Sequence, residues 1–197
     1  MWRHRPFLDL GLFGRGRRLP RHLAGLSELE LLNRANREQE LSNFLEAAQI
    51  YEVLSEKTLE QKQIRSGYLF LQSGRSYIQA DQTGLAMDCI KQGLSILAKA
   101  GRMHMIIQVG NRIVSELNYR DRRNEAQLVT NWLDVSLNGS IQAFGRSSIE
   151  VDPTRPRLPL KCLLCGGTLI PNEVEWLDQN TAECPYCGSP IRGGEGG

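Results

Sequence analysis

The sequence lacks the features of a membrane protein and of the common enzyme classes. No apolar run approaches the roughly 18 residues that suggest a membrane-spanning helix. There is no phosphate-binding P-loop, no H-E-x-x-H metalloprotease motif, no G-x-S-x-G nucleophile elbow and no glycine-rich dinucleotide turn. The three histidines have no serine, cysteine or carboxylate motif around them. The sequence therefore predicts a protein without a membrane span that is not an enzyme.

Proline is missing between Ser27 and Leu137, so more than half of the chain is free of the strongest helix breaker. Ser27 and Glu30 have the spacing of a capping box, which marks the start of a helix. Apolar residues then recur at helical intervals, as in residues 44–54. We expect a helical domain over residues 27–138, in a chain of 197 residues that is long enough for one medium and one small domain.

Similar segments recur in this region at a fixed period. "EAAQIYEVL" (46–54), "LAMDCIKQGL" (85–94) and "EAQLVTNWL" (125–133) align three alanines at intervals of 39 and 40. Upstream of the second and third segments, a glycine is followed three residues later by a large apolar side chain. Such a small residue lets paired helices approach closely. The small and large positions of the second repeat are Phe70, Gly74, Tyr77, Ala86 and Ile90.

This set of residues resembles the tetratricopeptide pattern W-x2-L-G-x2-Y…A-x3-F, and the resemblance covers roughly residues 40–138. The period of 39–40 departs from the usual 34, no proline closes a repeat, and Gly110 lies further from Ala126 than Gly74 lies from Ala86. The resemblance implies a mainly α fold, a tetratricopeptide-like antiparallel array of helical hairpins, whose concave face binds a peptide or helix of a partner protein. A compact helical bundle without such a groove is the alternative.

Four of the five cysteines form two pairs near the end of the chain, Cys162-x2-Cys165 and Cys184-x2-Cys187, which are separated by residues 166–183. Two residues between thiolates allow one tight turn to direct both sulfurs at a single ion. A glycine follows each pair, and a positive φ there can turn backbone amides toward the sulfurs. This spacing is typical of zinc sites. The fifth cysteine, Cys89, lies in a helical segment and is expected to be a small core residue.

Residues 160–192 are similar to a zinc ribbon, a small β domain with two such cysteine turns. Two disulfides, four unused thiols or an iron site of the rubredoxin type are the alternatives to zinc. Four thiolates fill a tetrahedral coordination sphere, so the predicted cofactor is one structural Zn²⁺ ion without an open position for a substrate. About 35 residues bury too little apolar surface to fold alone, and metal binding would supply the missing stability.

Charge is distributed unevenly along the chain. Residues 1–22 contain six arginines and one acidic residue, a net charge of +5, interleaved with apolar side chains. Such a segment is suited to an anionic membrane surface, to RNA or to a partner's groove, or is disordered at a terminus. It does not resemble an export signal, and a mitochondrial presequence is the alternative to the cytoplasm. Paired cysteines suit the reducing cytoplasm, which is the expected location.

The remaining segments complete the expected organisation. We expect a basic, flexible segment over residues 1–26, a proline- and serine-rich linker over 139–159 and a flexible tail over 193–197.

The charge of the cysteine segment favours a protein partner. Residues 160–197 have a net charge of −3, and the loop between the cysteine pairs carries Glu173, Glu175 and Asp178 and no basic residue, which would repel phosphate. The sequence therefore predicts a non-enzymatic adaptor that binds another protein through the helical groove, with the zinc ribbon as a second contact or a cap. The alternative is a nucleic-acid-associated regulator that uses the arginine-rich N-terminus and the ribbon.

Overall fold

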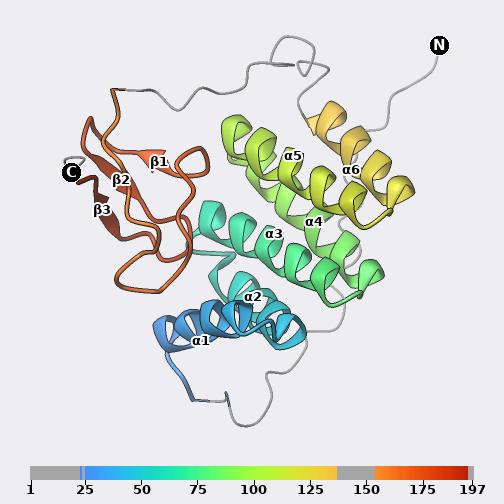
Figure 1. Ribbon diagram of the computed structural model, residues 1–197, viewed down its shortest axis with the longest axis horizontal. Helices are drawn as coiled ribbons and strands as arrows, with labels where there is room; N and C mark the ends of the chain where they lie inside the picture. The colour runs from blue at the N-terminus through green and yellow to red at the C-terminus, as the bar shows by residue number, and fades with distance from the viewer. Residues whose placement is uncertain (1–22, 24, 137–153, 195–197) are drawn as a thin grey trace.

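The computed structural model describes residues 23, 25–136 and 154–194 as six helices followed by a small sheet (Figure 1). The elements are α1 (Glu28–Glu40), α2 (Phe44–Thr58), α3 (Gln63–Gln79), α4 (Thr83–Lys99), α5 (Met103–Tyr119), α6 (Arg123–Ser136), β1 (Glu175–Trp176), β2 (Thr181–Glu183) and β3 (Pro190–Arg192). This order confirms the predicted mainly α fold with a small β segment at its end. None of the described helices is long and apolar enough to cross a membrane. Most of the predicted basic segment and most of the predicted linker lie outside the described residues.

Helix α1 begins at the capping box that the sequence predicts. The backbone N–H of Ser27 donates to the Glu30 carboxylate at 2.8 Å, and the Ser27 hydroxyl accepts from the N–H of Glu30 at 3.3 Å. These two bonds satisfy N–H groups that have no partner within the helix, and they fix the point at which the chain becomes helical.

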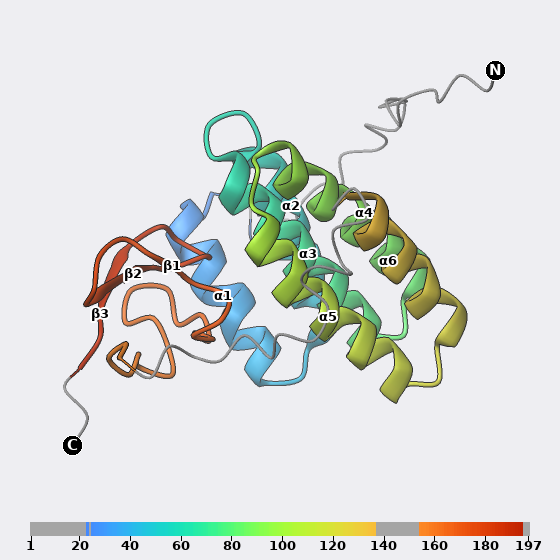
Figure 2. The same ribbon diagram turned by 90° about the horizontal axis from the view of Figure 1, so that it is seen from above.

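The helices form two layers. Each helix packs against the next one along the chain, and α3 also packs against α5 and α4 against α6. Figure 2 shows α1, α3 and α5 in one layer, which we call the first layer, and α2, α4 and α6 in the other. The apolar core lies between the layers. Its largest fully buried side chains include Leu31, Leu54, Tyr77, Leu94 and Ile106.

The loops between most of the helices share one structure, and this structure explains the period. In loops 41–43, 80–82, 100–102 and 120–122 the central residue has a φ between 56° and 70°, and the third residue donates to a carbonyl five residues earlier at 2.9 Å. Helices α3, α4 and α5 have 17 residues each, so each of them with its loop takes up the same length of chain. From the start of α4 to the start of α6 the chain advances 40 residues, and from the start of α2 to the start of α4 it advances 39, which are the two intervals between the alanines. This period is longer than the roughly 34 residues of tetratricopeptide repeats because the helices themselves are longer.

Helices α3 and α4 approach closely at a glycine. A Cβ atom at Gly74 would lie 2.6 Å from Cγ1 of Ile90 and 3.1 Å from the carbonyl oxygen of Ala86, so the small and large residues meet in the way the pattern predicts. In the next hairpin, a Cβ atom at Gly110 would lie 2.5 Å from the Leu133 side chain. Gly74 is the twelfth residue of α3 and Gly110 the eighth of α5, so the two contacts differ by one helical turn. This turn accounts for the wider spacing between Gly110 and the alanine of its hairpin.

The C-terminal sheet has three short antiparallel strands in the order β1-β2-β3. Its registers pair Glu175 with Glu183, Trp176 with Ala182 and Ala182 with Ile191. Asp178 shapes the turn between β1 and β2, because its Oδ1 accepts from two backbone N–H groups at 2.7 Å each. Arg157 forms a bridge with Gly194, so both ends of this segment are tied together. We call residues 157–194 the C-terminal unit.

Candidate metal centre

Two loops of the C-terminal unit have the same backbone structure. In the first knuckle, residues 162–167, the N–H of the fifth residue donates to the carbonyl of the first at 2.8 Å, and the N–H of the first donates to the carbonyl of the sixth at 2.9 Å. The second knuckle, residues 184–189, has the same two bonds at the same lengths. The fifth residues are Gly166 and Gly188, with φ values of 72° and 76° that L side chains rarely adopt. The glycine after each cysteine pair therefore closes the turn.

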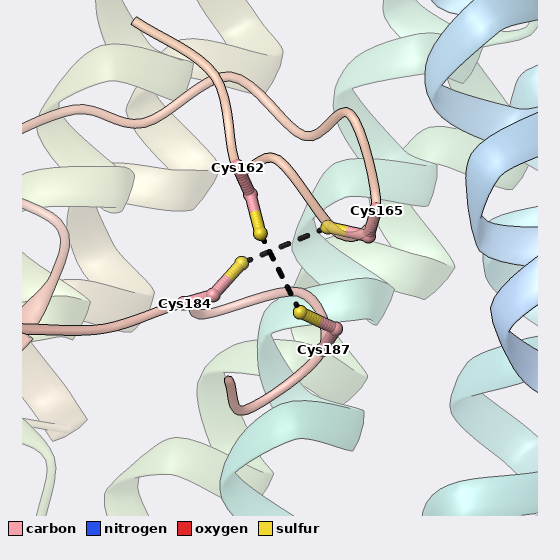
Figure 3. A group of neighbouring side chains, drawn as sticks. All are labelled: Cys162, Cys165, Cys184 and Cys187. Atoms are coloured by element: carbon pink, nitrogen blue, oxygen red, sulfur yellow. Dashed lines mark hydrogen bonds between the residues drawn. The ribbon is translucent and has the colours of Figure 1, made fainter. Parts of the chain in front are cut away.

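The four predicted ligands meet between the knuckles (Figure 3). The Sγ atoms of Cys162, Cys165, Cys184 and Cys187 all lie within 4.8 Å of one another. Cys162 Sγ lies 3.7 Å from Cys187 Sγ, and Cys165 Sγ lies 3.7 Å from Cys184 Sγ, so each close pair joins one knuckle to the other. Four sulfurs at about 2.3 Å from a central ion lie roughly 3.8 Å apart in a tetrahedron. The cluster therefore has the size of a tetrahedral metal site.

The thiols influence one another's protonation. Hydrogen bonding to Cys184 raises the pKa of the Cys165 thiol, whereas hydrogen bonds from Cys165 and Cys184 lower the pKa of Cys187. The Ser189 hydroxyl lies 3.0 Å from Cys187 Sγ and acts in the same direction. A metal requires all its sulfur ligands as thiolates, so binding releases the protons of these thiols.

A cleft of about 530 Å³ separates the second knuckle from the start of α3. Cys187 is half-buried, unlike the other three cysteines of the cluster, and it lines this cleft together with Cys184. Glu183 also lines the cleft, and burial together with neighbouring Glu175 raises the pKa of its carboxyl group. The cleft gives a small ion or chelator access to the partly exposed Cys187.

The first knuckle is bonded to helix α1. Asn36 Nδ2 donates to the carbonyl oxygen of Cys165 at 2.6 Å, and Asn36 Oδ1 accepts from the Tyr51 hydroxyl at 2.6 Å. Both ends of a buried amide are thereby satisfied. At the surface, Lys161 Nζ lies 2.6 Å from the Glu40 carboxylate. The backbone of a predicted ligand is therefore held by the helical domain.

The second knuckle inserts Tyr186 against α3. The Tyr186 ring is edge-on to Tyr68, with centroids 5.1 Å apart, and is tilted against Tyr51 at 6.3 Å. Arg65 Nε donates to the carbonyl oxygen of Tyr186 at 2.5 Å, and its Nη1 pairs with Glu28 at 3.1 Å. Burial raises the pKa of Tyr186 to about 12, so its ring remains neutral in this contact.

The loop between the knuckles directs acidic side chains at α5. Glu173 is only 2% exposed; its carboxylate accepts from the Tyr68 hydroxyl at 3.0 Å and lies 3.3 Å from Arg112 Nε. Glu175 pairs with Arg102, which precedes α5, at 2.5 Å. The sequence predicts that this loop repels phosphate, but the carboxylates of Glu173 and Glu175 pair with arginines of the helical domain and Glu173 is buried.

Other residues that the sequence singled out lie away from the cluster. Cys89 is buried in α4, with its Sγ 3.6 Å from the Ser73 hydroxyl, which confirms the predicted core position. His104 Nε2 lies 3.1 Å from the carbonyl oxygen of Asn172. Trp176 is half-buried, with the Arg155 guanidinium 4.9 Å from its ring centroid.

Comparisons of the chain with protein-family models, with curated proteins and with solved structures give no match. The interpretation of this centre therefore rests on the geometry of its two knuckles and four thiols.

Proposed function

We propose that the four cysteines bind one structural Zn²⁺ ion and that the C-terminal unit is a zinc ribbon. The matching knuckles and the sulfur separations of 3.7 Å support this proposal. Four thiolates leave no coordination position for water or substrate, so the ion holds the unit together and the chain is not a zinc enzyme. Iron bound in the rubredoxin manner is the alternative occupant.

Metal analysis of the purified chain tests this part of the proposal. We expect one zinc per chain, which Cys165→Ser removes and the buried control Cys89→Ser retains. A preparation that contains iron and absorbs visible light contradicts zinc. A preparation without metal and with four oxidised cysteines contradicts any metal site.

We further propose that the chain is a non-enzymatic adaptor of the reducing cytoplasm, with a tetratricopeptide-like helical domain and the zinc ribbon as cap and second contact. The observation that carries this proposal is an exposed apolar group on and beside the first knuckle. Leu160, Leu163 and Leu164 are 84%, 99% and 52% exposed, although the adjacent Cys162 and Cys165 are buried. Large apolar side chains gathered on a surface mark an interaction site, and three leucines favour a protein partner.

The first layer supports the same proposal. In the tetratricopeptide-like interpretation, the first helix of each hairpin faces the partner. In this chain, that layer already holds a polypeptide segment, the C-terminal unit, through Asn36 of α1, Arg65 and Tyr68 of α3 and Arg112 of α5. The ribbon therefore acts as the cap of the layer and presents its leucines on the outside.

A tagged pull-down tests the adaptor proposal, with and without nuclease. We expect to recover a defined protein partner that nuclease treatment does not remove. The double variant Leu163→Ser with Leu164→Ser should lower the recovered amount at least tenfold. The matched control is Leu177→Ser, which removes another exposed leucine of the C-terminal unit, beyond β1. Recovery of nucleic acid alone, or of proteins that vanish with nuclease, contradicts the adaptor.

One observation favours the nucleic-acid-associated regulator as the second candidate. Because Glu173 and Glu175 pair with Arg112 and Arg102, the repulsion between the acidic loop and phosphate is smaller than the sequence suggests. This candidate predicts a salt-sensitive shift of labelled DNA or RNA that disappears when residues 1–22, with their six arginines, are deleted.

A further inference from the structure

We infer that the metal centre controls access to the first layer: the C-terminal unit covers α1, α3 and α5 while its knuckles are held together, and uncovers them when the metal is lost. This inference rests on the proposed zinc site and names the regulation of the first layer, the helical face that binds a partner in the tetratricopeptide-like interpretation. Its basis is that both knuckles contribute atoms to the contact with the helices, in addition to the carboxylates of the loop between them.

Two backbone carbonyls of the knuckles accept hydrogen bonds from the helical domain, one buried and the other partly buried. Asn36 binds the carbonyl of Cys165, a predicted ligand, and Arg65 binds the carbonyl of Tyr186, which lies between Cys184 and Cys187. A carbonyl reaches its donor only while the loop that carries it keeps its curled shape. Loss of the metal removes the main constraint on both loops, so both contacts weaken together.

The aromatic contact depends on both knuckles at once. A Cβ atom at Gly167 of the first knuckle would lie 2.6 Å from Cδ2 of Tyr186 in the second, so the two loops are packed directly together. The Tyr186 ring in turn packs against Tyr68 and Tyr51 of the helical domain. Separation of the knuckles therefore removes the packing that holds Tyr186 in its place between the helices.

The two parts of the chain differ in what stabilises them. The buried apolar side chains form one cluster and most of them belong to the helices, whereas the C-terminal unit has three strands of two or three residues each. A unit of this size depends on its metal for folding, and the helices do not. Loss of the metal should thus leave the helices folded and Tyr51, Tyr68, Arg65 and Arg112 open to solvent and to a partner.

Because coupling is reciprocal, a change on the helices must alter metal affinity. The experiment measures Zn²⁺ affinity of the full chain by competition with a chromogenic chelator. We expect Asn36→Ala, which removes two buried hydrogen bonds, to weaken Zn²⁺ binding about tenfold. Arg65→Ala is the second variant and should act in the same direction. Matched controls are Asn118→Ala and Arg123→Ala, at exposed positions away from the C-terminal unit, with affinities within about twofold of the parent chain.

A second readout follows the opening itself. Circular dichroism and fluorine NMR of the fluorotyrosine-labelled chain are recorded before and after chelation. We expect the helical signal to persist and the resonances of Tyr51 and Tyr68 to become solvent-sensitive, while Tyr77, buried in the core, does not change.

The outcomes separate this inference from the proposed function. Unchanged Zn²⁺ affinity in both Asn36→Ala and Arg65→Ala overturns the coupling, even if zinc is bound and a partner is captured. Loss of the helical signal on chelation also overturns it, because the surface is then destroyed rather than uncovered. A preparation without any zinc site contradicts the proposed function first.

Discussion

The close approach of α3 and α4 allows a prediction with opposite signs at two glycines of one hairpin. At Gly74 an added Cβ atom would lie 2.6 Å from Ile90 Cγ1, about 1 Å inside the normal carbon–carbon separation of roughly 3.5–4.0 Å. Gly84, near the start of α4, has no atom within 4 Å of an added Cβ. Gly74→Ala must therefore push the helices apart, whereas Gly84→Ala meets only solvent.

The magnitudes follow from packing and from helix propensity. Overpacking a core contact costs typically about 1–3 kcal/mol, which the better helix propensity of alanine offsets by about 0.5–1 kcal/mol. We expect Gly74→Ala to lower the free energy of unfolding by about 1–2 kcal/mol and Gly84→Ala to raise it by up to about 1 kcal/mol. For a chain of this size each kcal/mol corresponds to about 2–4 °C, so a difference of about 1–3 kcal/mol should separate the two midpoints by roughly 2–12 °C.

Thermal and urea unfolding, followed by circular dichroism with zinc in excess, measure this difference. A Gly74→Ala chain as stable as the parent would refute the reasoning, because α3 and α4 could not then be in close contact at Gly74. Equal stabilisation by both substitutions would show that only helix propensity is at work, without a close contact.

Three further predictions concern the buried tyrosines and the loops. Burial raises the pKa of Tyr51 and Tyr68 well above 10, so above pH 10 the folded state keeps protons that the unfolded state loses. The free energy of unfolding should therefore fall above pH 10, and at pH 11 the loss should be about 1.4 kcal/mol for each tyrosine. Tyr51→Phe should make this fall less steep in urea unfolding. Tyr68→Phe removes a hydrogen-bond donor from the buried Glu173 carboxylate and should lower the free energy of unfolding by about 1.5–3 kcal/mol in the same assay. This loss must be smaller in a Glu173→Gln background, and Tyr119→Phe, at an exposed position, should not change the free energy of unfolding. Ser42→Gly, at the positive φ of the first repeated loop, should raise the free energy of unfolding by up to about 1 kcal/mol, and a decrease would contradict the strain assigned to that loop.

Local patterns carried most of what could be predicted. The capping box at Ser27, the glycines after the cysteine pairs and the spacing of the cysteines each act within a few residues, where bond geometry leaves few choices. The hairpin period could be predicted for the same reason, since successive hairpins of nearly equal length repeat the sequence pattern. The four cysteines therefore meet where the spacing predicts, while the identity of the metal stays a prediction.

The contacts between distant segments were not predictable from such patterns. Leu164 and Tyr186 occupy the same position in two matching knuckles, yet Leu164 is exposed and Tyr186 is buried against the helices. A duplicated motif does not specify which copy faces a neighbouring domain. Glu173 and Arg112 are likewise far apart in the chain, and each has the charge of an ordinary surface residue until their pairing buries the carboxylate. For the contact between the second knuckle and the helices, the available signal in the sequence was the aromatic side chain of Tyr186.

The distance in sequence between the knuckles and their helical partners has a consequence for the order of events during synthesis. Asn36 and Cys165 are 129 residues apart, whereas each helix packs mainly on the next one along the chain. Helical domains with such local contacts fold in microseconds to milliseconds, but a ribosome needs on the order of ten seconds to add that many residues. Every newly made chain therefore passes through an interval in which the first layer is folded and bare, before the segment that covers it exists.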